Sequence, residues 1–189
     1  MADGRVITAY DERPEAVAPG PTVDAVLAEV NGHLSGWDPQ SELARFNAVS
    51  GTDWIPASLL FIEAIDEAQA VSRASGGAFD VTVGPLVRAW GFGAGALEVA
   101  PAPSQPVLDA LRAKIGHHRL ELREQPPALR KAEPELTLDL DGIAPGWAVD
   151  RIAGRLDALG VTDYLVELGG EVRARGRSPA GRPWRVAIE

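Results

Sequence analysis

Residues 76–86 have the sequence GGAFDVTVGPL and follow the clearest helical pattern of the chain. That pattern spans residues 57–75, where apolar side chains recur at three- and four-residue spacing along one stripe. Gly76 and Gly77 predict the end of the helix, because glycine accepts the positive φ that a helix stop requires. Paired glycines also expose backbone N–H groups that a ligand can approach closely. The alternative is a helix stop followed by a buried turn, with Asp80 capping nearby amides.

The remaining elements follow from periodicity on either side of this stretch. Three- and four-residue spacing predicts further helices over residues 22–34, 39–47, 106–115 and 147–159. In the second of these, we expect Asp38 as the cap and Pro39 at the first helical position. Alternation of apolar and polar residues predicts strands over residues 118–123, 136–140, 163–168, 171–176 and 184–188. Helices come first and strands cluster later, which favours an α+β fold with helices packed on a mainly antiparallel sheet.

Composition excludes several classes of function. The chain has 189 residues, which fits one domain over residues 1–189, and its formal net charge is −9. We expect no nucleic acid and no anionic membrane as partner, because a negative field repels both. The sequence contains no Cys, which excludes disulfides, thiolate nucleophiles and sulfur-ligated metals. The first residues lack the apolar run of a secretory signal.

Two other loops carry candidate ligand groups. Residues 35–41 (SGWDPQS) place Trp37 in a loop with Gly and Pro, where its ring stacks on a ligand or else plugs a hydrophobic gap. Residues 139–150 (DLDGIAPGWAVD) join a predicted strand to a helix N-terminus, where free N–H groups favour a phosphate. Asp139 and Asp141, beside exposed carbonyls, are suited to a hard cation. A plain strand–turn–helix corner is the alternative for this last loop.

Four segments, in this order, resemble the flavin transferase family often called ApbE: residues 35–47, 76–93, 139–150 and 165–188. The second segment, GGAFDVTVGPLVRAWGFG, is the longest and most specific. The resemblance implies the α+β fold of that family. It also implies a magnesium-dependent transfer of FMN from FAD to a Thr or Ser hydroxyl of an acceptor flavoprotein, with release of AMP.

The resemblance assigns roles to individual residues by position. The main-chain carbonyl of Gly142 falls where the family ligates the metal, and no catalytic side chain is assigned. Three positions differ from the family's pattern: Trp37 replaces Tyr, Asp141 replaces Gly, and Pro145 replaces Lys. The first keeps a stacking ring, the second adds a carboxylate beside the metal, and the third removes a side-chain contact. The positions implied to contact FAD are Trp37, Ala78, Phe79, Asp80, Asp139 and Pro145.

FAD bound in this way would lie across the turns at residues 76–80 and 139–146, so these turns must meet in space. The family's main metal ligands lie in a later Ala-Asp-x-x-x-Thr-like segment that this chain does not contain. We therefore expect the domain to be incomplete at its C-terminal end, with a missing segment or a second chain completing the sheet. The alternatives are a non-catalytic FAD-binding relative and a magnesium-dependent FAD pyrophosphatase giving FMN and AMP. The resemblance implies the cell envelope or periplasm, with the cytoplasm as the alternative.

Overall fold

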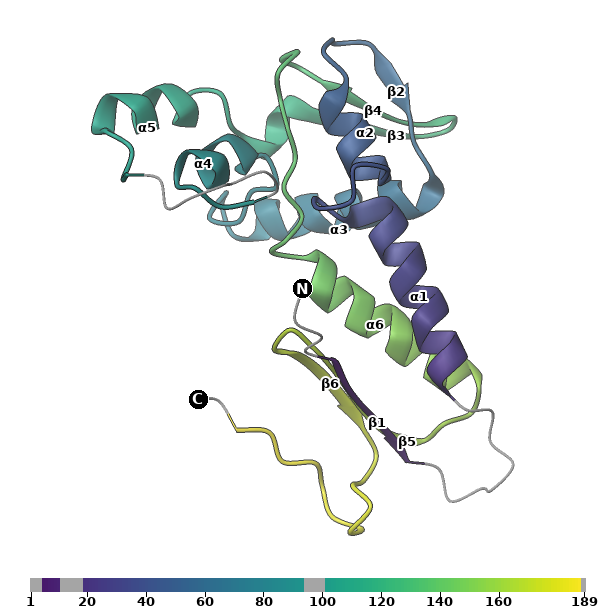
Figure 1. The fold of residues 1–189 in the computed structure, drawn as a ribbon. Coiled ribbons are helices and arrows are strands. Elements are labelled where there is room, and N and C mark those ends of the chain that lie inside the picture. The colour runs from purple at the N-terminus through teal and green to yellow at the C-terminus, as the bar shows by residue number, and fades with distance from the viewer. Residues whose placement is uncertain (1–4, 11–18, 94–100, 188–189) are drawn as a thin grey trace. The chain divides into compact units, whose positions relative to one another are not determined.

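The computed structural model describes residues 5–10, 19–93 and 101–187 (Figure 1). Backbone packing divides the chain into a terminal unit, residues 1–30 with 143–189, and a central unit, residues 31–142. Each unit contains helices and a three-stranded antiparallel sheet, which confirms the predicted α+β class. The single domain over residues 1–189 stays a prediction. Within the described part, no helix is both long and apolar enough to cross a bilayer.

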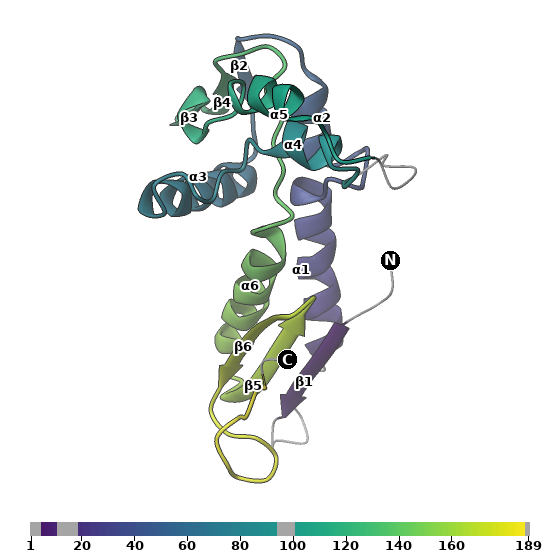
Figure 2. The same ribbon diagram turned by 90° about the vertical axis from the view of Figure 1, so that its left-hand side faces the viewer.

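The terminal unit holds a sheet with strand order β1-β5-β6, and Figure 2 shows these strands side by side. Helix α6 packs against β5 and β6. The side chains of Tyr164 and Val166 are almost fully buried. Helix α1 begins in this unit and continues into the central unit. The other elements are β1 (Arg5–Tyr10), α6 (Ala144–Ala158), β5 (Asp163–Leu168) and β6 (Glu171–Arg175), and α1 spans Pro19–Leu34.

Charged pairs connect β6 to α6. Arg173 donates to Asp150 at 2.5 Å, and Arg175 donates to Asp157 at 2.6 Å. The Asp157 carboxylate also accepts a hydrogen bond from the Tyr164 hydroxyl at 3.0 Å. The hydrogen bonds from Arg175 and Tyr164 hold the pKa of Asp157 below its ordinary value. These pairs are exposed, so they add orientation more than stability.

The central unit is built around α3, which packs against β3 and β4 of a sheet with order β2-β4-β3. Its core includes Phe61, Ile65 and Leu129, which are 0% exposed. Lys131 is also buried; its ammonium group donates to the carbonyl of Val49 at 2.6 Å, and burial lowers its pKa. The elements are α2 (Glu42–Ala48), β2 (Trp54–Pro56), α3 (Leu59–Ala74), α4 (Gly84–Ala89), α5 (Gln105–Arg112), a 3₁₀ turn (His117–Arg119), β3 (Leu120–Glu124) and β4 (Pro127–Lys131).

The predicted helices exist, with shifted ends. The second predicted helix begins at Glu42 instead of residue 39, and Ser41 instead of Asp38 is its cap, accepting a hydrogen bond from the amide of Ala44 at 2.9 Å. The end predicted at Gly76 and Gly77 is confirmed, since their φ values are 62° and 83°. The strands predicted over residues 163–168 and 171–176 are confirmed almost to the residue. The strand predicted over residues 118–123 is confirmed from Leu120 onward, where β3 begins after a 3₁₀ turn.

Two predicted strands are wrong. Residues 136–140 are extended and their leucines are buried, but the backbone bonds of this segment go to a side chain and a loop carbonyl instead of a strand. Residues 184–187 form no strand, and residue 188 lies outside the described residues. The chain here makes one isolated bridge, between Arg177 and Pro183. The alternation of apolar and polar residues over 136–140 therefore predicted correctly which side chains are buried. It did not show which groups bond to the backbone of this segment.

Candidate functional site

The turn after α3 is held together by the Asp80 side chain. One carboxylate oxygen accepts hydrogen bonds from the amide and the hydroxyl of Thr82, at 2.8 and 2.6 Å. The other oxygen accepts from the amide of His117 at 2.7 Å. Thr82 is buried, and its hydroxyl accepts from the amide of Gly116 at 2.7 Å. A carboxylate has about four acceptor positions. Three of the acceptor positions of Asp80 are therefore occupied by hydrogen bonds within the protein, and one of these bonds joins the turn to His117.

The turn at residues 76–81 lies directly beside the start of the predicted phosphate loop. The amide of Asp139 donates to the carbonyl of Val81 at 2.7 Å. The Phe79 ring lies 3.3 Å from the position that a Cβ atom would take at Gly142. A side chain at position 142 would therefore press on Phe79. The structure thus brings residues 76–81 and 139–142 together, as expected; residues 143–146 belong to the terminal unit.

Asn47, on α2, anchors the extended segment that leads into Asp139. Its side-chain amide donates to the carbonyl of Leu138 at 2.9 Å and its carbonyl oxygen accepts from the amide of Leu138 at 2.8 Å. This pair of bonds replaces the neighbour that a strand would have supplied. Leu138 and Leu140 are buried on the same side of the segment. Asp139 and Asp141 alternate with them and border a cavity.

The cavity has a volume of about 70 Å³ and is formed entirely within the central unit. A volume of this size admits a small polar group or a few water molecules, since one water takes up about 30 Å³ of liquid. It does not enclose a dinucleotide, which would have to extend over the surrounding surface. Its lining residues are Gly36, Trp37, Leu43, Asn47, Gly84, Val87, Arg88, Gly93, Leu138, Asp139, Leu140 and Asp141.

Trp37 lies in a loop whose backbone is fixed by serine hydroxyls. Ser35 Oγ accepts from the amides of Trp37 and Asp38, at 3.1 and 3.2 Å. The buried Ser41 hydroxyl donates to the carbonyl of Ser35 at 2.6 Å and closes the loop. The Trp37 ring nevertheless remains 54% exposed. A large ring held on a rigid loop and left open to solvent is suited to stacking on a flat ligand.

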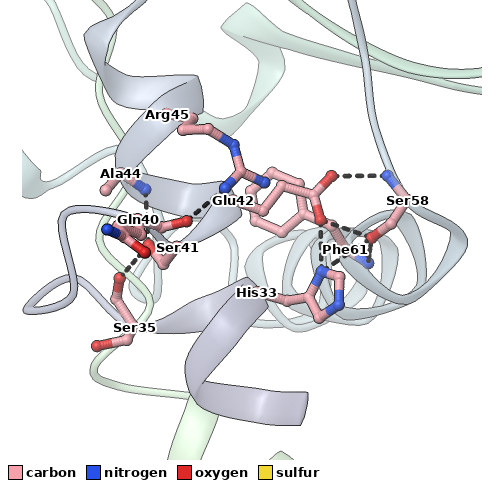
Figure 3. A network of polar contacts seen from close by, with 9 residues as sticks. All are labelled: His33, Ser35, Gln40, Ser41, Glu42, Ala44, Arg45, Ser58 and Phe61. Carbon is pink, nitrogen blue, oxygen red and sulfur yellow. Dashed lines mark hydrogen bonds and ion pairs between the residues drawn. The ribbon is translucent and has the colours of Figure 1, made fainter. Parts of the chain in front are cut away.

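A partly buried polar network fixes the helices on both sides of this loop (Figure 3). Glu42 Oε2 contacts His33 Nδ1 at 2.5 Å and accepts from the Ser58 hydroxyl at 2.6 Å. Its other oxygen accepts from the amide of Ser58, also at 2.6 Å. Ser58 Oγ in turn caps α3 by accepting from the amide of Phe61 at 3.1 Å. The network thereby joins the end of α1, the start of α2 and the start of α3.

The same network determines the charge state of Glu42. Burial acts to raise the pKa of its carboxyl, but hydrogen bonds from Ser58 and His33 outweigh it, and the pKa lies below the ordinary value. Glu42 is therefore ionised wherever the protein is folded near neutral pH. Because α1 ends and α2 begins on this network, it limits the movement of the Trp37 loop.

Asp141 shows the opposite behaviour. Burial of its carboxyl group raises its pKa, although the residue as a whole is exposed. The nearby Asp139 carboxylate raises the pKa further, while a hydrogen bond from the Trp37 side chain lowers it. Two carboxylates therefore share a small space with few donors. Such a pair is stabilised by a bound cation, because the added positive charge offsets the repulsion.

Comparison with known proteins identifies this arrangement. The model of the ApbE family matches residues 6–189. The chain belongs to the ApbE family. The FAD:protein FMN transferase of Vibrio cholerae is 41% identical over 169 residues, which are 88% of this chain and 49% of that protein. The FAD:protein FMN transferase of Haemophilus influenzae is 38% identical over the same shares of both chains. The chain thus spans about half the length of the curated relatives it matches.

Solved ApbE structures have the same fold. The flavin transferase ApbE from Vibrio cholerae matches with a TM-score of 0.87 at 34% identity, over 98% of this chain and 63% of that chain. The apo form of the Pseudomonas stutzeri flavinyl transferase ApbE matches with a TM-score of 0.85 at 34% identity, over 97% of this chain and 62% of that chain. These matches confirm the ApbE-like α+β fold that the sequence motifs predict.

The residues predicted to contact FAD fall in three environments. Trp37 and Asp139 border the cavity. Ala78, Phe79 and Asp80 form the adjoining turn, where Ala78 is exposed and the other two are half-buried. Pro145 lies in the first turn of α6, in the terminal unit. Their contacts with FAD stay a prediction.

Sequence reasoning missed Asn47 and Arg88 as residues of the site. Asn47 ends the segment of residues 35–47 that resembles the family, but an Asn on a helix gives no local signal that it anchors a segment 91 residues away. Arg88 lies on α4, which is not among the helices that periodicity predicts. Both residues line the cavity. Their role depends on non-local neighbours, which periodicity does not report.

The oxygen atoms of this family member suit a hard cation. Asp139 and Asp141 supply carboxylates, and Gly142 follows them with an exposed main chain. Among the described residues, no group of three or more His, Asp or Glu side chains is placed to hold a metal ion. Magnesium takes about six oxygen ligands. The described residues therefore fit part of a magnesium shell, with water or substrate oxygens filling other positions.

Proposed function

We propose that this chain takes part in the transfer of FMN from FAD to a Thr or Ser hydroxyl of an acceptor flavoprotein. The observation that supports this best is the meeting of residues 76–81 with residues 139–142, beside a cavity bordered by the exposed Trp37 ring. Both turns carry the motifs of a family whose curated members are named FAD:protein FMN transferases. An extended, ring-bearing substrate suits an open surface of this kind.

The reaction replaces one phosphorus–oxygen bond with another. The acceptor hydroxyl oxygen attacks the phosphorus on the riboflavin side of the FAD diphosphate. The bond from that phosphorus to the bridging oxygen breaks, and AMP leaves with this oxygen and the electron pair of the bond. The hydroxyl proton passes to solvent. Catalysis of such a step consists mainly of positioning and of charge stabilisation.

The residues of the central unit would divide these tasks. Trp37 would stack on a ring of FAD, and its loop is held rigid by Ser35 and Ser41. Asp139, Asp141 and the Gly142 carbonyl would hold magnesium. When bound, magnesium offsets negative charge on the diphosphate oxygens. Burial and then the Asp139 carboxylate raise the pKa of Asp141, and the positive charge of the ion would offset the second of these effects.

The test is a mixture of the purified chain, FAD, magnesium and an acceptor protein with a target Thr. Transfer yields a covalently flavinylated acceptor and AMP in equal amounts, measured by mass spectrometry and chromatography. Release of FMN and AMP without acceptor would show a pyrophosphatase instead. Absence of FAD binding by the chain would refute the proposal. Asp139→Asn is the variant expected to lose magnesium-dependent turnover.

A second candidate is an FAD-binding module without transfer activity. It is favoured by the incomplete set of acidic metal ligands among the described residues. In the same assay, this candidate predicts FAD retained on the chain and no AMP. The two candidates therefore differ in one product.

A further inference from the structure

Among the residues that line the cavity, one carries a positive charge. Arg88, on α4, lies at a rim that also contains Asp139 and Asp141. The chain as a whole has a net charge of −9, so its field does not attract a phosphate. An anionic group entering this cavity would therefore depend on local positive charge. Arg88 is the side chain of the lining that supplies it.

The structure holds the Arg88 guanidinium in place through Thr137. Arg88 NH2 donates to Thr137 Oγ1 at 2.9 Å. Both groups gather beside Gly84, where a Cβ atom would lie 3.1 Å from Thr137 Oγ1 and 3.4 Å from Arg88 NH1. A residue with a side chain at position 84 would crowd the Arg88 guanidinium and the Thr137 hydroxyl, and Gly84 avoids this. Thr137 precedes Asp139 by two residues, so Arg88 is attached to the segment that carries the acidic pair.

Within the described part of the chain, no carboxylate forms an ion pair with Arg88. Its hydrogen-bond partner among the described residues is a neutral hydroxyl, whereas several other arginines of the central unit pair with acids, such as Arg112 with Asp109 at 3.3 Å. A guanidinium has several N–H donors in a planar fork, and the hydroxyl occupies one of them. This fork matches two oxygens of a phosphate, a geometry that an ammonium group does not reproduce. Arg88 is exposed, so a ligand can reach it.

We propose that Arg88 binds a phosphate group of the flavin nucleotide and makes the site selective for phosphorylated flavins over riboflavin. The inference rests on the proposed function, because it assumes that a flavin nucleotide occupies this cavity. Trp37 and Arg88 then divide recognition between them. The ring of Trp37 would stack on the isoalloxazine of any flavin. The Arg88 guanidinium would add affinity only for flavins that carry a phosphate. Thr137 acts as a positioning residue for Arg88.

The experiment measures dissociation constants by calorimetry for the chain of residues 1–189 at fixed magnesium. The ligands are FAD, FMN, ADP and riboflavin. Arg88→Gln should weaken FAD binding roughly ten- to hundredfold, the usual effect of losing charge-assisted hydrogen bonds. Riboflavin binding should stay within about twofold of the wild type, because riboflavin has no phosphate for Arg88 to bind. Arg88→Lys should give an intermediate loss for FAD, since it keeps the charge without the fork.

The matched control is Arg112→Gln, which removes an exposed arginine of the same unit outside the cavity. It should leave all four affinities unchanged. Thr137→Val should weaken FAD binding less than Arg88→Gln and leave riboflavin unaffected. A selective loss of FMN affinity would place Arg88 at the riboflavin-side phosphate, and a selective loss of ADP affinity would place it at the other phosphate.

Three outcomes would overturn the inference. Equal loss of FAD and riboflavin affinity in Arg88→Gln would mean that the residue supports the fold of the cavity. Unchanged FAD affinity in Arg88→Gln would mean that no phosphate contacts it. A wild-type chain that binds none of the four ligands would refute the proposed function as well, so the two failures are distinguishable.

Discussion

Two acidic turns of the central unit, around Asp80 and around Asp141, are alike in sequence and differ in what their carboxylates do. Asp80 accepts three hydrogen bonds from within the protein, at 2.6 to 2.8 Å. Asp141 sits near a second carboxylate, and burial together with that neighbour raises its pKa. The first acid stabilises the fold, and the second is left with capacity for a ligand. Glycine and aspartate in a loop therefore do not by themselves mark a binding site, because the groups around the carboxylate decide its role.

The sharpest test of this contrast is Asp80→Ala. The substitution leaves the amides of Thr82 and His117 without their acceptor, in a corner that is half-buried. We expect a loss of about 2–4 kcal/mol of unfolding free energy, because an unsatisfied buried donor costs about 1–3 kcal/mol. The melting temperature should fall by roughly 5–15 °C in calorimetry. Asp141→Ala is the control and should cause no loss; equal losses would end the distinction.

Glu42 should behave like Asp80, because its carboxylate also accepts several donors. Glu42→Gln should cost about 1.5–3 kcal/mol at neutral pH, the range for a hydrogen bond to a charged group. The folded pKa of Glu42 is lowered, so its contribution is present above the unfolded pKa and is lost as pH falls through the folded pKa. Urea unfolding of both proteins between pH 7 and pH 3 measures this. A difference that stays constant with pH would contradict the ionic role.

Asp141→Asn should change stability in the opposite direction from Glu42→Gln. Asp141 binds its proton more tightly when folded, so its contribution to stability is largest below the unfolded pKa and is lost as pH rises through the folded pKa. Removing the charge should therefore raise the melting temperature at pH 7 by about 1–2 °C, as for a partly screened surface interaction. The gain should vanish in acid. Magnesium affinity should fall in the same variant, which calorimetry measures.

The smallest change in stability is expected for Trp37→Phe. The ring is exposed, so unfolding free energy should stay within about 0.5 kcal/mol of the wild type. Phe lacks the indole N–H that donates to Asp141, so the pKa of Asp141 should rise further. Titration of the Asp141 carboxyl by NMR checks this. An unchanged pKa would mean that Trp37 and Asp141 act independently.

Most helices and three strands were predictable because their signals are local. The apolar stripe of α3 and the glycines that end it lie within one stretch, and the positive φ of Gly76 follows from glycine chemistry. Strand β4 was missed because two adjacent residues, Ala128 and Leu129, are buried, which breaks the alternation, and because Lys131 is a charged residue that only the folded core makes acceptable. The segment at residues 136–140 was taken for a strand because its burial alternates in the same way.

The sequence predicted which loops form the candidate site, but it did not predict which residues hold those loops together. Trp37, residues 76–80 and residues 139–142 were identified from motifs, and the structure places them around one cavity or beside it. The use of Asn47 as an anchor and of Arg88 as the cation at the rim was not predictable. Each depends on a partner roughly 50 to 90 residues away, and no local pattern encodes such a partner.

By itself, the sequence determined the class of fold, the helices with their stops, and the family to which the turns belong. These properties depend on spacing, on backbone freedom at glycine and on the order of residue types, all of which can be seen along one chain. The tertiary structure decided which partners complete the two carboxylate sites, because the amide of His117 that reaches Asp80 and the Trp37 side chain that reaches Asp141 both come from segments distant along the chain.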